Sequence, residues 1–131
     1  MTKREIKAIG KRMDKIEERI KGVKKTMKAQ LQEIALRYGY EPQSRQLIEE
    51  MAELTVAINK FWRANQKPAT DENLDKMRAA RSNIIEEIAD VGIMLEQITY
   101  LLDAHEDVQE IMAEKINRQL ERIKKESEGK K

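Results

Sequence analysis

The sequence contains no cysteine, a single histidine (His105) and two prolines, and aromatic residues make up 4% of its 131 residues. Without cysteine, the chain forms no disulfide and offers no thiolate to a metal. One histidine also excludes a multi-histidine zinc site within one chain. The scarcity of proline, glycine and aromatic residues is typical of a helical protein rather than a sheet protein.

Long hydrophobic runs are also missing. No apolar stretch approaches the roughly 20 residues that span a bilayer. The N-terminus is charged from Lys3 onward and lacks the apolar core of a signal peptide. We therefore expect a cytoplasmic protein that does not interact with a membrane.

Charge is abundant but unevenly distributed, at 38% of residues against 40% hydrophobic. Residues 1–36 carry eleven Lys/Arg and five Asp/Glu, a net +6. Residues 37–111 carry eight against fifteen, a net −7, and residues 112–131 carry seven against four, a net +3. This pattern suggests a cation site flanked by groups that meet phosphate, although solvated helix faces explain most of the individual charges.

The first segment predicts one long amphipathic helix over residues 3–37. Gly10 and Gly22 each weaken it by up to about 1 kcal/mol. Its narrow apolar stripe follows a near-heptad spacing that suits a partner helix, from this chain or another copy. The stripe consists of Ile6, Ile9, Met13, Ile16, Ile20, Val23, Met27, Leu31 and Ile34.

The remainder predicts three further helices. Gly39 fits a helix C-cap, and Pro42 fits the first turn of the next helix. Pro68 predicts a loop over residues 65–70. Apolar residues at three- and four-residue steps predict helices over residues 43–64, 72–102 and 106–126. The 72–102 helix carries a candidate interruption near residues 80–82, where Arg81 breaks its apolar row.

The fold expected is therefore all-α, a bundle of about four helices with a long N-terminal amphipathic helix. One domain boundary is predicted, between a coiled-coil-like segment, residues 1–38, and a helical domain, residues 39–131.

Two pairs of acidic residues carry the chemistry. Glu50 and Glu53, like Glu87 and Asp90, are three residues apart and so share one helix face. If the two helices pack antiparallel, four carboxylates meet in one cleft and repel each other unless a cation binds. Oxygen-only ligands suit Mg²⁺. The competing interpretation is a solvated acidic face, but these residues lack the basic partners four positions later that such a face usually has.

The pattern Glu49-Glu50-x-x-Glu53 followed by Glu87-x-x-Asp90 resembles the signature of the MazG-like all-α nucleotide pyrophosphohydrolases. The resemblance covers roughly residues 43–123. It implies a Mg²⁺-dependent enzyme, with Mn²⁺ as a substitute metal, that converts a nucleoside triphosphate to a monophosphate and pyrophosphate. It also implies a homo-oligomer, a dimer or a tetramer.

Roles for single residues follow from the same resemblance. Glu50, Glu53, Glu87 and Asp90 are the implied metal ligands. Glu49 is either a further ligand or orients the attacking water. Lys115, Asn117 and Arg118 match a C-terminal element that binds the β and γ phosphates, with a solvated basic face as the alternative.

Two features depart from the family pattern. Thirty-three residues separate Glu53 from Glu87, more than is usual, and the first 36 residues lack a counterpart in a minimal member. A base could stack on Trp62, although a core or subunit contact is the simpler explanation of this aromatic. Gln46 and Asn83 are candidates to bind a base edge.

Three alternative functions depend on other features of the sequence. A non-catalytic helical assembly or adaptor protein would use the residue 6–34 seam. A di-iron carboxylate bundle needs Glu-x-x-His pairs. The residue three positions before His105 is Leu102 and not a glutamate, so the sequence disfavours a di-iron site. The first helix lacks an aromatic to stack bases and mixes its charges, which argues against nucleic-acid binding.

Overall fold

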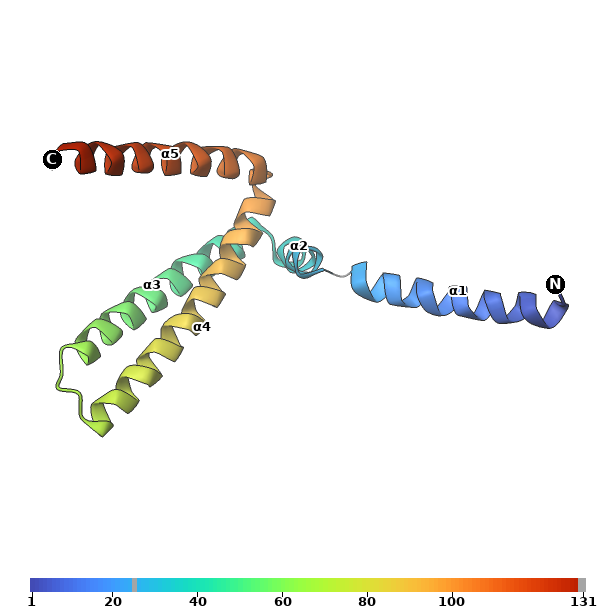
Figure 1. The fold of residues 1–131 in the computed structure, drawn as a ribbon, viewed down its shortest axis with the longest axis horizontal. Helices are drawn as coiled ribbons and strands as arrows, with labels where there is room; N and C mark the ends of the chain where they lie inside the picture. Colours follow the sequence, from blue (N-terminus) through green and yellow to red (C-terminus); the bar gives the residue numbers. More distant parts are fainter. Residues whose placement is uncertain (25, 130–131) are drawn as a thin grey trace.

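The computed structural model describes residues 1–24 and 26–129, and the side chains of all these except 20–24. The described residues form five helices and no strand (Figure 1), so the predicted all-α helical bundle is confirmed. The helices are α1 (Lys3–Lys24), α2 (Met27–Tyr38), α3 (Tyr40–Asn65), α4 (Asp71–Leu101) and α5 (His105–Gly129).

The centre of the fold is a hairpin of α3 and α4, which pack side by side and antiparallel (Figure 1). Gly39 adopts a φ of 84°, a value that glycine tolerates and other residues rarely do, and its N–H donates to the carbonyl of Ala35 to end α2. Pro42 lies in the first turn of α3, as predicted. The hydroxyl of Thr70 accepts a hydrogen bond from the N–H of Asn73 and starts α4 after the predicted loop.

The core is small and lies along the α3–α4 hairpin and under α2. Ala57 of α3 and Val91 and Met94 of α4 are buried, and α2 contributes Ala35 as it packs on α4 and, less extensively, on α3. Two buried amides from α3 and α4 also meet there, with Gln43 Nε2 donating a hydrogen bond to Gln97 Oε1. Because each amide needs the other, this pair fixes how α3 and α4 align.

The first predicted helix is wrong in one respect: it is two helices, α1 and α2. Thr26 has extended backbone angles, and its hydroxyl accepts a hydrogen bond from the N–H of Ala29, so it starts a new helix. The candidate interruption near residues 80–82 is absent, because α4 is continuous. Arg81 interrupts the row of apolar side chains but not the helical backbone. The two alanines before it, Ala79 and Ala80, favour a helix there.

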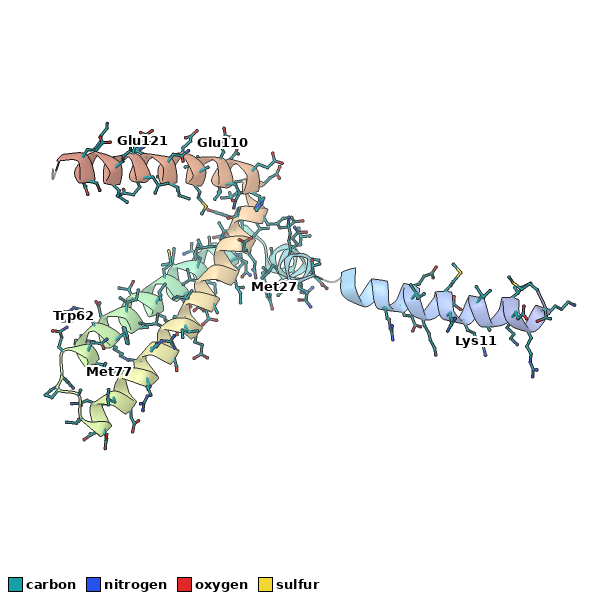
Figure 2. The ribbon with its side chains drawn as sticks, in the orientation of Figure 1. Lys11, Met27, Trp62, Met77, Glu110 and Glu121 are labelled. Atoms are coloured by element: carbon teal, nitrogen blue, oxygen red, sulfur yellow. The ribbon has the colours of Figure 1, made fainter. Side chains whose placement is uncertain are left out.

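A single copy leaves an unusual amount of surface in contact with solvent. Its accessible area is 11475 Å², against about 7,100 Å² for a compact protein of 15.3 kDa. α1 and α5 extend away from the hairpin (Figure 2), and their apolar side chains are exposed. Over the described ranges, none of the helices is both long and apolar enough to cross a lipid bilayer.

Candidate metal centre

Three of the predicted metal ligands come together between α3 and α4. Glu50, Glu53 and Glu87 each place one carboxylate oxygen within 4.8 Å of the other two. The three-residue step from Glu50 to Glu53 is slightly less than one turn, so both project to one side of α3. Antiparallel packing of α4 then brings Glu87 opposite them.

Two of these carboxylates have an oxygen that is shielded from water and lacks a hydrogen-bond partner among the described residues. Oε2 of Glu50 and Oε2 of Glu87 are buried, and neither has a hydrogen-bond partner within the described part of the chain. The other oxygen of Glu50 accepts a hydrogen bond of 2.8 Å from Nε2 of Gln46. An unsatisfied buried carboxylate oxygen is costly, so these two atoms indicate a missing partner.

The crowding of these carboxylates affects the pKa of Glu87. Burial raises the pKa of Glu87 above its ordinary value, and the neighbouring carboxylates of Glu53, Asp90 and Glu50 raise it further. Both causes act against the ionised form, because desolvation penalises any charge and the neighbouring carboxylates repel a further negative one. A bound cation would relieve both penalties at once.

The donor set fits a hard divalent cation. All three ligands are carboxylates, two bring an unsatisfied oxygen, and the solvent-facing Glu53 leaves the group accessible. Mg²⁺ takes oxygen ligands, keeps several waters and bridges to substrate phosphates. Glu50, Glu53 and Glu87 therefore match the chemistry of the metal that the sequence implied.

The remaining acidic candidates lie beside this group. Asp90 is half-buried on the next turn of α4, near enough to raise the pKa of Glu87. It is not among the three carboxylates that meet within 4.8 Å. Glu49 is exposed next to Glu50 and also lies outside that group.

A shallow groove of about 320 Å³ opens beside the carboxylates. It is lined by Ala52, Glu53, Val56, Lys60, Asn83 and Glu87. Lys60 brings a positive charge and Asn83 an amide to the edge of the acidic group. Lys60 was not among the residues predicted from the sequence, although a signal existed: it follows Glu53 by seven residues, about two turns, and so shares its face.

The other predicted substrate-binding residues do not line this groove. Lys115, Asn117 and Arg118 are exposed on α5, which contacts α4 at their junction. Trp62 is 63% exposed near the end of α3 and points into solvent (Figure 2). Gln46 donates a hydrogen bond from its side-chain amide to the carboxylate of Glu50, one turn along the same helix. Their roles in binding nucleotide stay predictions.

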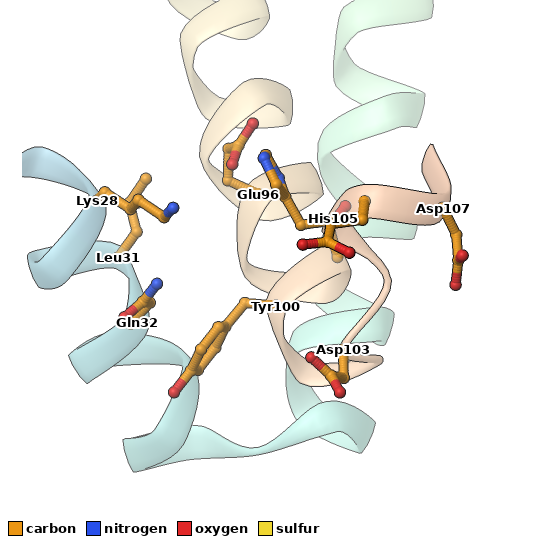
Figure 3. A pocket seen from close by; sticks show the side chains of 10 residues that line it. Lys28, Leu31, Gln32, Glu96, Tyr100, Asp103, His105 and Asp107 are labelled. Carbon is orange, nitrogen blue, oxygen red and sulfur yellow. The ribbon is translucent and has the colours of Figure 1, made fainter. Parts of the chain in front are cut away.

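A second cavity, of about 430 Å³, lies where α2, α4 and α5 meet (Figure 3). Lys28 and Gln32 line it from α2, Glu96 and Tyr100 from α4, and His105 from the start of α5. Acidic and basic side chains are mixed around it. Among the described residues, the carboxylates gather closely enough to share a metal at Glu50, Glu53 and Glu87 and not here.

Comparison with known proteins adds nothing to this geometry: no family model, no curated protein and no solved structure matches the chain.

Proposed function

We propose that this chain is a Mg²⁺-dependent nucleoside triphosphate pyrophosphohydrolase, which releases a nucleoside monophosphate and pyrophosphate. The observation that carries the proposal is the meeting of Glu50, Glu53 and Glu87, two of them with an unsatisfied buried oxygen. The reaction itself is suggested by the resemblance of Glu49-Glu50-x-x-Glu53 and Glu87-x-x-Asp90 to the MazG-like enzymes.

The carboxylates would bind the metal, and a neighbouring amide would keep one of them in position. Glu50, Glu53 and Glu87 are the proposed ligands, with Asp90 joining them from the next turn. Gln46 keeps one oxygen of Glu50 in place by donating a hydrogen bond to it. Bound Mg²⁺ would supply Lewis acidity at the α-phosphate and neutralise charge on the leaving pyrophosphate.

Residues at the groove would bind and orient the substrate. Lys60 borders the acidic group and would pair with a phosphate oxygen. Asn83, on the facing helix, would donate or accept a hydrogen bond. Glu49 would either add a ligand or orient the attacking water. Cationic side chains from α5, Lys115 and Arg118, would bind the outer phosphates once α5 is brought to a groove, which we expect in a dimer or a tetramer.

The direct experiment identifies the products. Purified protein is incubated with a panel of canonical and modified nucleoside triphosphates, with Mg²⁺ or with EDTA, and the reaction is followed by ³¹P NMR. Pyrophosphate and monophosphate formed only with Mg²⁺ would support the proposal. Orthophosphate and a diphosphate would indicate cleavage of the other phosphoanhydride bond and contradict it.

A matched pair of variants ties any activity to this site. Glu87→Gln keeps the size of the side chain and removes the charge, so turnover should fall by at least about a hundredfold if the group holds the metal. Glu86→Gln makes the same change one residue earlier, at an exposed position. It should leave turnover unchanged, and equal losses in both variants would point to a general effect of charge on α4.

A second candidate function is a helical assembly or adaptor protein without catalysis. The exposed apolar stripe of α1 favours it, since Ile6 and Met13 are 58% and 57% exposed. The two candidates differ in one result. If none of the triphosphates is cleaved with Mg²⁺ or Mn²⁺ while the protein still assembles, the adaptor interpretation holds.

A further inference from the structure

The charge along the groove beside the carboxylates changes sign. Toward the junction with α2 and α5, Glu49 of α3 and Asp90 of α4 add further negative charge. Toward the loop that joins α3 to α4 (Figure 1), the groove is lined by Lys60 and Asn83, one positive and one neutral. A chain of phosphates that begins at a metal between the helices is therefore repelled by the first side and attracted to the second.

Arg63 extends the positive side beyond Lys60. It follows Lys60 by three residues, so both side chains project from one edge of α3. Counted along the helix axis from Glu53, Lys60 lies roughly 10 Å away and Arg63 roughly 15 Å, because each residue advances about 1.5 Å. Both side chains are exposed, and neither forms an ion pair with a residue that the structure describes. The two cations are therefore spaced along one line that starts at the carboxylates.

Two other cations near the loop are paired or face elsewhere. Lys76 of α4 forms an ion pair of 3.3 Å with Glu72. Arg81 has no such partner over the described ranges, but it precedes Asn83 by two residues and so projects from nearly the opposite side of α4. Arg63 therefore adds an unmatched charge on the side of the hairpin that bears the groove.

A guanidinium suits the terminal phosphate of a triphosphate. Its planar N–H donors bind two phosphate oxygens at once, whereas the ammonium of Lys60 acts as a point charge. A terminal phosphate offers more free oxygens than an inner one. A diphosphate is one phosphate shorter, so it extends less far toward Arg63. Both the position and the chemistry of Arg63 therefore favour a triphosphate.

The competing ligands for the outer phosphates are Lys115 and Arg118 of α5. α5 contacts α4 near the turn that joins the two helices, so these side chains require another copy to reach a groove. Arg63 requires no second copy, because it shares α3 with Glu53 and Lys60. The terminal phosphate lies against a different helix in each case.

We infer that the phosphate chain of the substrate lies along the groove from Glu53 toward the loop between α3 and α4, an inference that rests on the proposed function. Lys60 binds the middle of the chain, and Arg63 binds the terminal phosphate. The uncharged nucleoside then occupies the acidic side of the carboxylates, which does not repel it. Arg63 thereby determines specificity, because a diphosphate forgoes its contact.

The affinity for inorganic tripolyphosphate tests this path without a choice of base. Titration calorimetry of the full chain in Mg²⁺ should show binding that Arg63→Gln weakens by at least about fivefold. Arg81→Gln removes the same charge from the opposite side of the same end of the hairpin, and it should leave the affinity unchanged. Absence of binding by the wild type, an unchanged affinity in Arg63→Gln, or an equal loss in both variants would overturn the inference.

A structural effect of Arg63 is separated by two further measurements. Arg63 lies in the last turn of α3, where a positive charge interacts favourably with the helix dipole. Loss of that interaction lowers the melting temperature but leaves the binding of Mn²⁺ alone unchanged, since Arg63 lies away from the carboxylates. A variant that loses Mn²⁺ and tripolyphosphate together would assign Arg63 to the fold and contradict a contact with phosphate.

A photoreactive analogue tests the direction of the phosphate chain. ATP that carries an azidoanilide on its γ-phosphate is bound in Mg²⁺ and irradiated, and the labelled peptide is identified by mass spectrometry. Labelling should fall within residues 61–70, at the loop end of the groove. Labelling of α5, or of none of the residues near the loop, would contradict this direction.

The same variants separate this path from the proposed reaction. Binding of tripolyphosphate that depends on Arg63, without cleavage of any triphosphate, would refute the proposed enzyme and keep the path of the phosphates. Mg²⁺-dependent cleavage with a KM that Arg63→Gln leaves unchanged would keep the enzyme and refute the path.

Discussion

Glu50 of α3 and Glu87 of α4 meet across the helix hairpin, and each buries a carboxylate oxygen that accepts no hydrogen bond from the residues that the structure describes. A protein that only needed to pack two helices would place apolar side chains at these positions, since unpaired buried charge destabilises the fold. The arrangement becomes favourable when a cation is shared. The stability of the hairpin and the binding of a metal should therefore be coupled.

Removing one of these charges should stabilise the metal-free protein. In the presence of EDTA, Glu87→Gln relieves both the burial of a charge and its repulsion by Glu53 and Glu50. We expect thermal unfolding, followed by circular dichroism, to shift to higher temperature by several degrees. Glu86→Gln, an exposed neighbour, serves as the control and should not shift it. A lower melting temperature for Glu87→Gln would show that the carboxylate of Glu87 stabilises the fold even without a metal.

The same carboxylate predicts how stability depends on pH. The pKa of Glu87 is raised in the folded state, so folding strengthens its hold on a proton. Its contribution to stability is therefore complete below the pKa of an unfolded glutamate and is lost as pH rises through the raised value. In EDTA, this contribution should fall as the pH rises from the pKa of an unfolded glutamate through the raised pKa of Glu87 in the wild type, and it should be absent in Glu87→Gln. The difference between their melting temperatures across this range is the measurement, and a constant difference would contradict the assignment.

The buried amide pair predicts a different kind of coupling. Gln97→Leu leaves the amide of Gln43 without its partner and should reduce the free energy of unfolding by about 1–3 kcal/mol. Replacing both glutamines by leucine leaves no unpaired buried amide at this position and should restore most of the lost free energy of unfolding. Urea denaturation of the two single variants and the double variant measures this. Losses that simply add would show that the hydrogen bond does not couple the two positions.

Lys60 should contribute to substrate binding more than to folding. Because it lines the groove beside Glu53, Lys60→Ala should raise KM for a triphosphate by roughly tenfold, about 1.4 kcal/mol, with a smaller change in kcat. Lys67→Ala, in the exposed loop before α4, is the matched control. Steady-state kinetics on both variants tests the assignment, and equal KM values would remove Lys60 from the site.

The sequence predicted the parts of this fold that are set locally. Pro42 and Gly39 act through their own backbone or nearest neighbours, and each lies where a first turn or a cap was expected. The break between α1 and α2 was missed because the apolar stripe runs through it without a gap. Thr26 could have indicated this break, because a threonine that caps a new helix interrupts the helical backbone without changing the spacing of the apolar residues.

The meeting of the central carboxylates could be predicted from the sequence, and the placement of the other candidate residues around them could not. Glu50, Glu53 and Glu87 were found because helical spacing and one packing assumption suffice to bring them together. Lys115 and Arg118 could not be placed in the same way, because the direction of α5 depends on the turn at Asp103, a residue with a φ of 49°. Periodicity says which side of a helix is apolar, but not which helix, or which copy, covers it.

The most direct test of the central claim is a titration of Mn²⁺ into the metal-free protein, followed by the electron paramagnetic resonance signal of free Mn²⁺. We predict that wild-type protein and Glu86→Gln remove Mn²⁺ from solution in a saturable way, that Mg²⁺ competes, and that Glu50→Gln, Glu53→Gln and Glu87→Gln each weaken binding by at least about tenfold. If wild-type protein binds no more Mn²⁺ than these three variants do, the carboxylates between α3 and α4 do not form a metal centre.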